Sequence, residues 1–385
     1  MRWVLVIALA SCGRLDFDLD GFGSSGSNGS SGSNAPDAGA GPVLHLGPGD
    51  GMPGTGDLTF DANGTIDTTK LTISIALPAG VTFVHAQQVP ATTEVAVLHV
   101  NAFTIEEVAT VGVIGTDPLI IVAGSDVVIA GTIDASAHGA TGGPGAGATG
   151  AGMAGLHLAP DNDTGGGGGS YGGRGAAGGA SMNASCPIAG GITGTVFGDA
   201  VITVLIGGAP GGFSSGAACA LDPGGAGGGA LQITSYTSIV NSGNVLAGGG
   251  GGRGGTDCGV IDANSGAGGG AGGAIVLQAP IIQNSGAIAA NGGGGGGGGL
   301  GEGGTGGAGE DATSVSVAIG GVGTVAGTSG GNGAAGTSSA AAGVDQTMCD
   351  ENSGGGGGGL GRIAVSSSYI GAGMVTPAPD TTLPP

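Results

Sequence analysis

A pattern of two short apolar runs followed by a block of glycine recurs along this chain and constrains its fold more than any other feature. The copy in residues 272–301 reads GGAIVLQAPIIQNSGAIAANGGGGGGGGLG. Aligning the copies places Ala230, Ala274 and Arg362 at equivalent positions, with spacings of 44 and 88 residues. Self-similarity at a fixed period is typical of stacked repeats, in which each unit buries its apolar face against its neighbours.

The apolar runs have the character of β-strands. They are short, rich in Ile and Val, and end at turn residues, so that 241–243 (NSG) matches 284–286 (NSG) at a spacing of 43 residues. An earlier copy covers residues 119–135, with GTI at 131–133 in place of GAI at 286–288. Short runs with tight turns favour strands over helices. We therefore predict an all-β fold, a parallel β-helix or solenoid of short strands with glycine-rich loop excursions. A β-sandwich built from the same strands is the alternative.

Glycine makes up 99 of the 385 residues, far above the usual share of about 7%. No strict Gly-X-Y period is present and only 17 residues are Pro, which excludes collagen. Charged residues are only 9% and apolar runs recur throughout, which argues against disorder of the whole chain.

Glycine is concentrated in three excursions, residues 139–228, 248–273 and 292–361, and apolar islands at 192–206 and 315–325 are predicted to add further strands. The excursions are either loose loops or Gly-Gly-X segments packed side by side as extended helices with three residues per turn. Only glycine allows such close backbone approach. The cysteines and apolar residues within the excursions favour at least partial packing.

The amino-terminal residues predict export and lipidation. Residues 1–11 (MRWVLVIALAS) carry one basic residue and a short apolar core, typical of a secretory signal peptide and too short to span a bilayer. The ending Leu9-Ala10-Ser11-Cys12 resembles a bacterial lipobox, which implies a lipid on Cys12. Gly13 favours the outer membrane by resemblance to the sorting rule of enteric bacteria, with the body on the periplasmic face or the cell surface.

The rest of the chain divides by composition. Residues 12–41 form a Gly/Ser-rich tether that follows the lipidated cysteine. Residues 42–138 are the part poorest in glycine and are predicted to be the amino-terminal part of the solenoid. Residues 139–377 hold the glycine-rich repeats, and 378–385 are a short tail.

The net charge of −21 limits the class of partner. The chain has only six Lys and Arg residues against 27 Asp and Glu. Nucleic-acid binding requires clustered basic side chains, so no nucleic-acid partner is expected. For the same reason, anionic lipid headgroups are not expected as partners of the folded part.

Four cysteines remain after Cys12: Cys186, Cys219, Cys258 and Cys349. An even number in an exported chain indicates two disulfides. Three connectivities are possible, and nearest-neighbour spacing suggests Cys186–Cys219 with Cys258–Cys349. A metal site is disfavoured because the sequence has no C-x-x-C spacing around these cysteines.

Catalytic motifs are weak. Residues 212–216 (GFSSG) match the nucleophile elbow G-x-S-x-G, but such matches arise by chance in a glycine-rich chain and the required strand-turn-helix context is absent. No G-K-[ST] follows a glycine run, so a P-loop is excluded. His85 and His99 have no partner at H-x-H or HExxH spacing, and we expect both to be structural.

Polysaccharide cleavage and calcium binding are alternatives with some support. Enzymes that resemble pectate lyase use clustered Asp with basic residues on a β-helix, and here only Asp257 and Asp262 lie near Arg253. Weak calcium binding is conceivable at 161–163 (Asp161-Asn162-Asp163), 310–311 (Glu310-Asp311) and 350–351 (Asp350-Glu351), although we expect solvated turns there. No other cofactor or metal is expected.

The lipobox, the tether, and the motifs PLIIVAGSDVVIAGTIDAS and GGALQI together resemble glycine-rich lipoproteins and exported proteins of myxobacteria and related deltaproteobacteria. The chain also looks like the glycine-repeat (PGRS) proteins of mycobacteria, without their helical head. Neither resemblance implies an established activity or any functional residue.

These observations predict a non-enzymatic, lipid-anchored protein of the cell envelope that acts as a structural or adhesive element. Its expected contacts are the membrane through the lipid, and extracellular polysaccharide, other cells or a second copy through the folded part. The alternatives are a polysaccharide-acting enzyme on a β-helix scaffold, and a repetitive surface that binds a glycan or ice.

Overall fold

The computed structural model describes residues 42–158, 162–199, 201–217, 220–259, 262–301, 304–324, 327–349 and 352–384. They belong to one compact unit, Gly39–Pro385. The described residues form strands, turns and irregular segments and contain no helix, and so none long and apolar enough to cross a membrane. The predicted signal peptide, Cys12 and the tether lie outside these residues.

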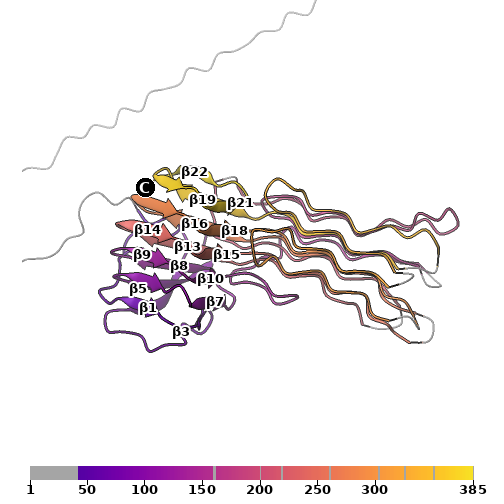
Figure 1. Ribbon diagram of the computed structural model, residues 1–385, viewed down its shortest axis with the longest axis horizontal. Helices are drawn as coiled ribbons and strands as arrows, with labels where there is room; N and C mark the ends of the chain where they lie inside the picture. The colour runs from indigo at the N-terminus through magenta and orange to yellow at the C-terminus, as the bar shows by residue number, and fades with distance from the viewer. Residues whose placement is uncertain are drawn as a thin grey trace, which may run out of the picture. The chain divides into compact units, whose positions relative to one another are not determined.

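Three sheets account for nearly all the described strands (Figure 1). The first sheet contains, in spatial order, β1 (Leu58–Phe60), β6 (Phe103–Ile105), β9 (Val127–Ile129), β14 (Ser238–Asn241), β17 (Ile281–Asn284) and β20 (Tyr369–Gly371). The second contains β21 (Met374–Thr376), β18 (Ala287–Ala289), β15 (Asn244–Leu246), β10 (Thr132–Asp134), β7 (Thr110–Ile114), β2 (Gly64–Asp67) and β3 (Thr72–Ile73). The third contains β22 (Asp380–Leu383), β19 (Arg362–Ser366), β16 (Ala274–Gln278), β13 (Ala230–Ser235), β8 (Leu119–Ala123), β5 (Glu94–Val100) and β4 (Thr82–Gln87). A separate short pair joins β11 (His157–Leu158) and β12 (Asn162–Asp163).

The register between repeats agrees with the sequence spacing. Ala230 is paired with Ala274, and Ala274 with Arg362, in parallel ladders of the third sheet. Asn241 and Asn284, which end the matching runs, are paired in the first sheet. The spacing of the apolar runs therefore predicted which residues lie side by side.

The predicted fold class, a parallel β-helix or solenoid with glycine-rich loop excursions, is wrong. The second and third sheets are mixed, because β3 pairs antiparallel with β2 and β4 pairs antiparallel with β5, so the strands do not form a closed, uniformly parallel coil. The glycine-rich residues are not loops either, since they hydrogen-bond to one another. The chain is a multi-sheet fold with parallel and mixed sheets. The antiparallel hairpins occur once, at the amino-terminal end of the fold, and so leave no repeat in the sequence.

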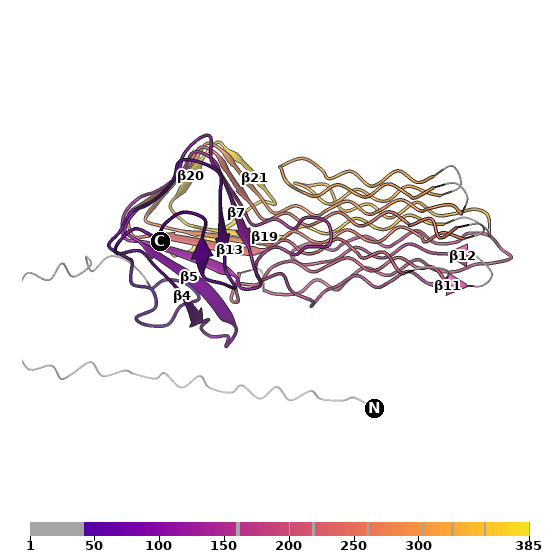
Figure 2. The ribbon, with the colours of Figure 1, turned by 90° about the horizontal axis from the view of Figure 1, so that it is seen from below.

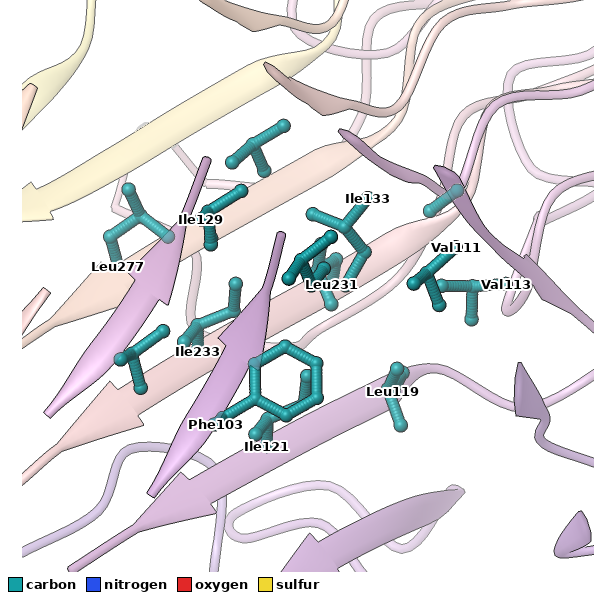
Figure 3. Packing of buried hydrophobic residues seen from close by; sticks show 14 of the residues in the cluster. Phe103, Val111, Val113, Leu119, Ile121, Ile129, Ile133, Leu231, Ile233 and Leu277 are labelled. Carbon is teal, nitrogen blue, oxygen red and sulfur yellow. The ribbon is translucent and has the colours of Figure 1, made fainter. Parts of the chain in front are cut away.

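The apolar core lies between the three sheets. Figure 3 shows Phe103, Ile129, Ile133, Ile233 and Leu277 from all three sheets pointing toward one another. All of these side chains are fully buried. Burial of apolar area of this kind is the main favourable term in folding, about 1.5–3 kcal/mol for each large aliphatic side chain.

The inner strands of the third sheet, from β5 to β19, are buried on both faces. These strands read as continuous apolar runs, such as LIIVA in β8, and all five residues of β8 are buried. The face turned away from the core is covered by a second apolar cluster, which includes Val43, Ile202, Leu205 and Tyr171. A strand covered on both sides needs apolar residues at successive positions rather than at alternate ones.

A polar row marks the turn that follows the first sheet. The Asn241 Nδ2 group donates to Asn284 Oδ1 at 2.7 Å, and the Asn284 Nδ2 group donates to the Tyr369 hydroxyl at 2.9 Å. Asn241 and Asn284 are buried, and asparagine suits this position because its side chain forms hydrogen bonds in turns. The repeated NSG motif thus fixes the same turn in successive repeats.

Glycine-rich residues enter and leave the sheets at equivalent places. Residues 135–229 connect β10 to β13, 247–273 connect β15 to β16, and 290–361 connect β18 to β19. Each connection runs from the second sheet to the third, and all three extend from one side of the sheets (Figure 2). We call the described residues of these three connections the glycine bundle.

The apolar islands predicted to form strands at 192–206 and 315–325 contain none among their described residues. Residues 192–194 and 318–323 instead form backbone hydrogen bonds with neighbouring segments of the glycine bundle. Their apolar composition alone does not reveal that their neighbours are glycine backbones rather than strands.

Candidate functional site

Residues 292–299 show how the glycine bundle is built. Their N–H groups fall into three sets, each made of every third residue. One set donates to carbonyls in residues 328–334, the second to 264–270 and the third to 307–310, at N···O distances of 2.8–3.0 Å. A three-residue period with bonding directed sideways is that of the extended polyproline II helix, which has no internal hydrogen bonds. The bundle is therefore a cross-bonded body, which confirms the packed alternative for the excursions.

Many interior positions of the bundle accept only glycine. A Cβ atom added to Gly292, Gly295 or Gly296 would lie within 3.0 Å of backbone atoms of a neighbouring segment. Real Cβ atoms essentially never come so close. The glycine runs are thus required by the packing, because backbones hydrogen-bonded in three directions leave no room for side chains.

Side chains reappear where a segment faces solvent. Met153 and Leu156 lie three residues apart and are 56% and 52% exposed. The Met153 N–H donates to the Ile192 carbonyl at 2.9 Å, and the Gly155 N–H donates to the Phe213 carbonyl at 3.0 Å. Ile192 and Phe213 are exposed as well. We call these four apolar residues, Met153, Leu156, Ile192 and Phe213, the apolar outer face.

A second set of exposed apolar residues follows the same rule on other segments. Ile319 and Val322 lie three residues apart and are exposed, as is Val344. The Gly321 N–H between the first two donates inward to Gly295 at 2.8 Å. The period of three therefore sorts residues into glycine that faces the bundle and larger side chains that face solvent.

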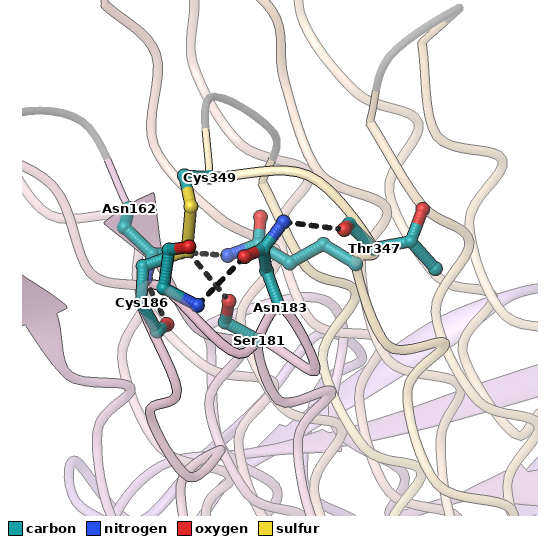
Figure 4. The surroundings of a disulfide bond; sticks show 8 residues. Asn162, Ser181, Asn183, Cys186, Thr347 and Cys349 are labelled. Atoms are coloured by element: carbon teal, nitrogen blue, oxygen red, sulfur yellow. Dashed lines mark hydrogen bonds between the residues drawn. A yellow bond between two sulfur atoms is a disulfide. The ribbon is translucent and has the colours of Figure 1, made fainter.

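The disulfide pairing suggested by nearest-neighbour spacing is wrong. Cys186 is bonded to Cys349, which lies 163 positions further along the sequence, and their Cα atoms are 5.9 Å apart (Figure 4). Cys258 is also disulfide-bonded, and Cys219 lies outside the described residues. The bundle brings residues distant in sequence together, so spacing along the chain is a poor guide to pairing.

Hydrogen bonds surround this disulfide (Figure 4). The Asn162 Nδ2 group donates to the Cys186 carbonyl at 2.8 Å, and the Asn183 Nδ2 group donates to the Thr347 carbonyl at 3.1 Å. The Gln346 amide also donates to Asn162 Oδ1. The disulfide therefore joins the first and third connections at the end of the glycine bundle far from the sheets.

The residues that matched catalytic motifs have structural partners. The Ser214 hydroxyl accepts the Asp222 N–H at 2.7 Å and is fully buried. His85 lies 3.0 Å from the Thr68 carbonyl, and His99 lies 2.6 Å from the Met52 carbonyl. Among the described residues, no group of three or more His, Cys, Asp or Glu side chains is arranged to hold a metal.

The acidic pairs considered for calcium are used in different ways. Asp311 accepts the N–H groups of Gly139 and Gly251 at 2.8 Å and 2.7 Å, so it joins the three connections of the bundle. Asp163 is fully buried, and Asn162 beside it is bonded to the disulfide region. Asp161, Asp350 and Glu351 lie outside the described residues.

A hollow of about 470 Å³ lies where the second sheet meets the glycine bundle. His138 lines it, with Nε2 at 4.0 Å from Asp134 and Nδ1 at 3.5 Å from Asp311. Because one oxygen of Asp311 already accepts two backbone N–H groups, this cluster serves to connect the bundle to the sheets.

Comparison with known proteins adds no relative: no protein-family model, curated protein or solved structure matches the chain.

The apolar outer face had a sequence signal that was missed. Met153 and Leu156 stand among glycines at a spacing of three, which is the period of the bundle. The exposed residues could have been found once that period was assumed for the excursions.

Proposed function

We propose that this protein is a non-enzymatic, lipid-anchored element of the bacterial cell envelope that makes adhesive contacts through its glycine bundle. The observation that carries the proposal is the apolar outer face. Large apolar side chains stand exposed there on a backbone that is held by hydrogen bonds in several directions. Grouped exposed apolar residues of this kind mark interaction sites in soluble proteins.

The arrangement of the bundle suits binding to a partner better than catalysis. The bundle orders its backbone with little apolar burial of its own, and its outward positions carry Met, Leu, Ile and Phe. Such a surface binds by excluding water from a partner, which requires no titratable group. A matrix polysaccharide, a neighbouring cell and a second copy of the chain are the partners that this surface would meet from the outer membrane.

A combined variant, Met153→Ser with Ile192→Ser and Phe213→Ser, tests the proposal. All three side chains are exposed, so we expect the thermal midpoint of unfolding to change little, while adhesion of cells to purified matrix falls at least about tenfold. Val108→Ser is the matched control, because Val108 is 79% exposed but lies outside the bundle. Equal loss of adhesion in the control, or none in the combined variant, would contradict the proposal.

Protease shaving of intact cells tests the location separately. If the protein is displayed outward, fragments of the tether at residues 12–41 are released from whole cells, while the bundle resists cleavage. Cleavage that begins only after the outer membrane is opened would contradict surface adhesion and leave a periplasmic scaffold as the function.

A further inference from the structure

The two ends of the sheets are finished in different ways. Figure 1 shows β1 and β3 at one end and β21 and β22 at the other. At the first end, the outermost strands of the second and third sheets, β3 and β4, run antiparallel to their neighbours and so end the parallel ladders. At the other end, β20 and β21 are the outermost strands of the first and second sheets and continue the parallel ladders. Within the described part of the chain, β20 is paired with β17 alone and β21 with β18 alone, so both present a free edge of N–H and C=O groups.

The apolar core is finished differently at the two ends as well. In and beside β3, the side chains of Leu71, Ile73 and Ile75 pack against the core. At the carboxyl-terminal end, Tyr369 of β20 and Val375 of β21 pack against the core and are only partly buried. Stacked repeats need terminal units that cover the core with a polar outer surface. The strands β20 and β21 do not supply such a surface.

The free edges at the carboxyl-terminal end carry no charge. Residues 363–379 include no Asp, Glu, Lys, Arg or His. Within this stretch, Ile370 of β20 is 68% exposed and Met374 of β21 is 62% exposed. By contrast, β1 at the opposite end of the first sheet lies between Asp57 and Asp61, which are both exposed. Charged residues at an edge oppose its pairing with another chain, so β1 is protected in this way and β20 is not.

A second copy of the chain is the partner that fits this end. Two chains that each carry a net charge of −21 repel one another, and the repulsion is weakest where neither presents a charge. An edge strand is also complementary to its own copy, because a two-fold axis places the two strands antiparallel and lets each donate hydrogen bonds to the other. Ile370 is the middle residue of β20. An axis at this residue therefore places two exposed Ile370 side chains opposite each other, where they shield one another from water.

We propose that two copies of this chain form a symmetric dimer in which β20 pairs antiparallel with β20 of the second copy, about a two-fold axis at Ile370. The pairing extends the first sheet through both copies and supplies hydrogen bonds to the free edge of β20. Because a two-fold contact uses the same surface on both copies, it closes at two chains and does not continue into a filament. The dimer is independent of the adhesive contact proposed above, because no residue of the apolar outer face takes part in it.

Sedimentation equilibrium of the purified mature protein, in a density-matched nonionic detergent, tests the dimer. We expect the mass of two chains, falling to that of one chain on dilution. Ile370→Asp places two carboxylates opposite each other and should raise the dissociation constant at least about thirtyfold, with the thermal midpoint of the fold unchanged because this side chain is exposed. Val108→Asp is the matched control: Val108 is 79% exposed and lies between β6 and β7, so the dimer should form as in the wild type.

A cysteine at the axis tests the register of the pairing. Opposite residues of an antiparallel pair have Cα atoms about 4.5–5.5 Å apart, which is within the range that a disulfide spans. Mild oxidation of Ile370→Cys should therefore link two copies, seen as a band of doubled mass on a non-reducing gel. Val108→Cys, treated in the same way, should stay a single chain.

Several results would overturn the proposal. They are a mass of one chain at every concentration up to about 100 μM, a dimer of Ile370→Asp as tight as that of the wild type, and no cross-link in Ile370→Cys. A dimer that is lost in the variant Met153→Ser with Ile192→Ser and Phe213→Ser, but kept in Ile370→Asp, would place self-association on the apolar outer face instead. A one-chain mass with slow amide exchange of residues 369–376 would show that another segment of the same chain covers β20.

Discussion

At the scale of single residues, the packing of the glycine bundle depends on residues that have no side chain. Successive N–H groups point toward neighbouring backbones in three directions. The space left at each Cα atom holds a hydrogen atom but not a methyl group. The sequence therefore shows glycine runs where backbones meet and larger residues at a period of three where a segment meets solvent.

Gly296→Ala tests this requirement at one position. The new Cβ would lie within 3.0 Å of the Arg253 carbonyl carbon and the Gly254 nitrogen, so the backbones must separate and hydrogen bonds are lost. We expect a loss of roughly 2–3 kcal/mol in the free energy of unfolding, seen as a lower thermal midpoint. Gly112→Ala in β7 is the control, because a Cβ there meets nothing within 4 Å and should change stability by less than about 0.5 kcal/mol. Equal effects at both positions would contradict the packing.

The buried carboxylate of Asp163 predicts a pH dependence of the stability of the fold. Burial raises the pKa of Asp163 in the folded state above its ordinary value. A raised carboxylate pKa means that the folded state binds the proton more tightly, so this contribution to stability is complete at acidic pH and is lost as the pH rises through the folded pKa.

The stability of the wild type relative to Asp163→Asn should therefore fall as the pH rises from about 4 toward 7. Urea unfolding midpoints of both proteins across this range measure the difference and cancel the effect of the other carboxylates. A difference that does not vary with pH would show that Asp163 titrates as it does in the unfolded chain.

At the scale of elements, the sequence predicts the strand register well and the bundle less well. Equivalent strands repeat Ile, Val and Leu at one spacing, and Ala230, Ala274 and Arg362 are in fact paired. The hairpins formed by β2 with β3 and β4 with β5 occur once and were missed. Their pairing depends on local turns that are not repeated along the chain, so the repeat pattern could not predict it.

The candidate site was less predictable for a physical reason. Contacts in the bundle join backbones, and a glycine backbone carries no sequence signal for its neighbour. Nothing in the sequence therefore showed that Cys186 meets Cys349 or that Asp163 meets Asn352. The segment Asp161-Asn162-Asp163 was visible as a polar cluster, but the neighbour of Asp163 from the third connection was not.

The Cys186–Cys349 disulfide should stabilise the far end of the bundle. It closes a loop of 163 residues, and loop-closure entropy alone gives an upper value of about 5 kcal/mol. We expect the double variant Cys186→Ala with Cys349→Ala to be cleaved by protease near residues 181–188 well before the sheets unfold. An unchanged cleavage pattern would mean that backbone hydrogen bonds alone hold this end.

At the scale of the whole molecule, one chain combines two parts that are stabilised in different ways. The sheets are held by an apolar core, and the glycine bundle is held by backbone hydrogen bonds in several directions. Because the bundle has little need of apolar burial, its apolar side chains are free to face solvent, and this is the physical basis for the proposed adhesive contact.

The central claim is that the glycine-rich residues form an ordered, cross-bonded body. Amide hydrogen exchange followed by mass spectrometry tests it most directly, because every interior glycine N–H is expected to be bonded. We predict that peptides covering residues 264–273, 292–299 and 352–361 exchange as slowly as those of the third sheet. Exchange of these peptides at the rate of an unfolded chain would show that the glycine-rich residues are loose loops, and would contradict the account.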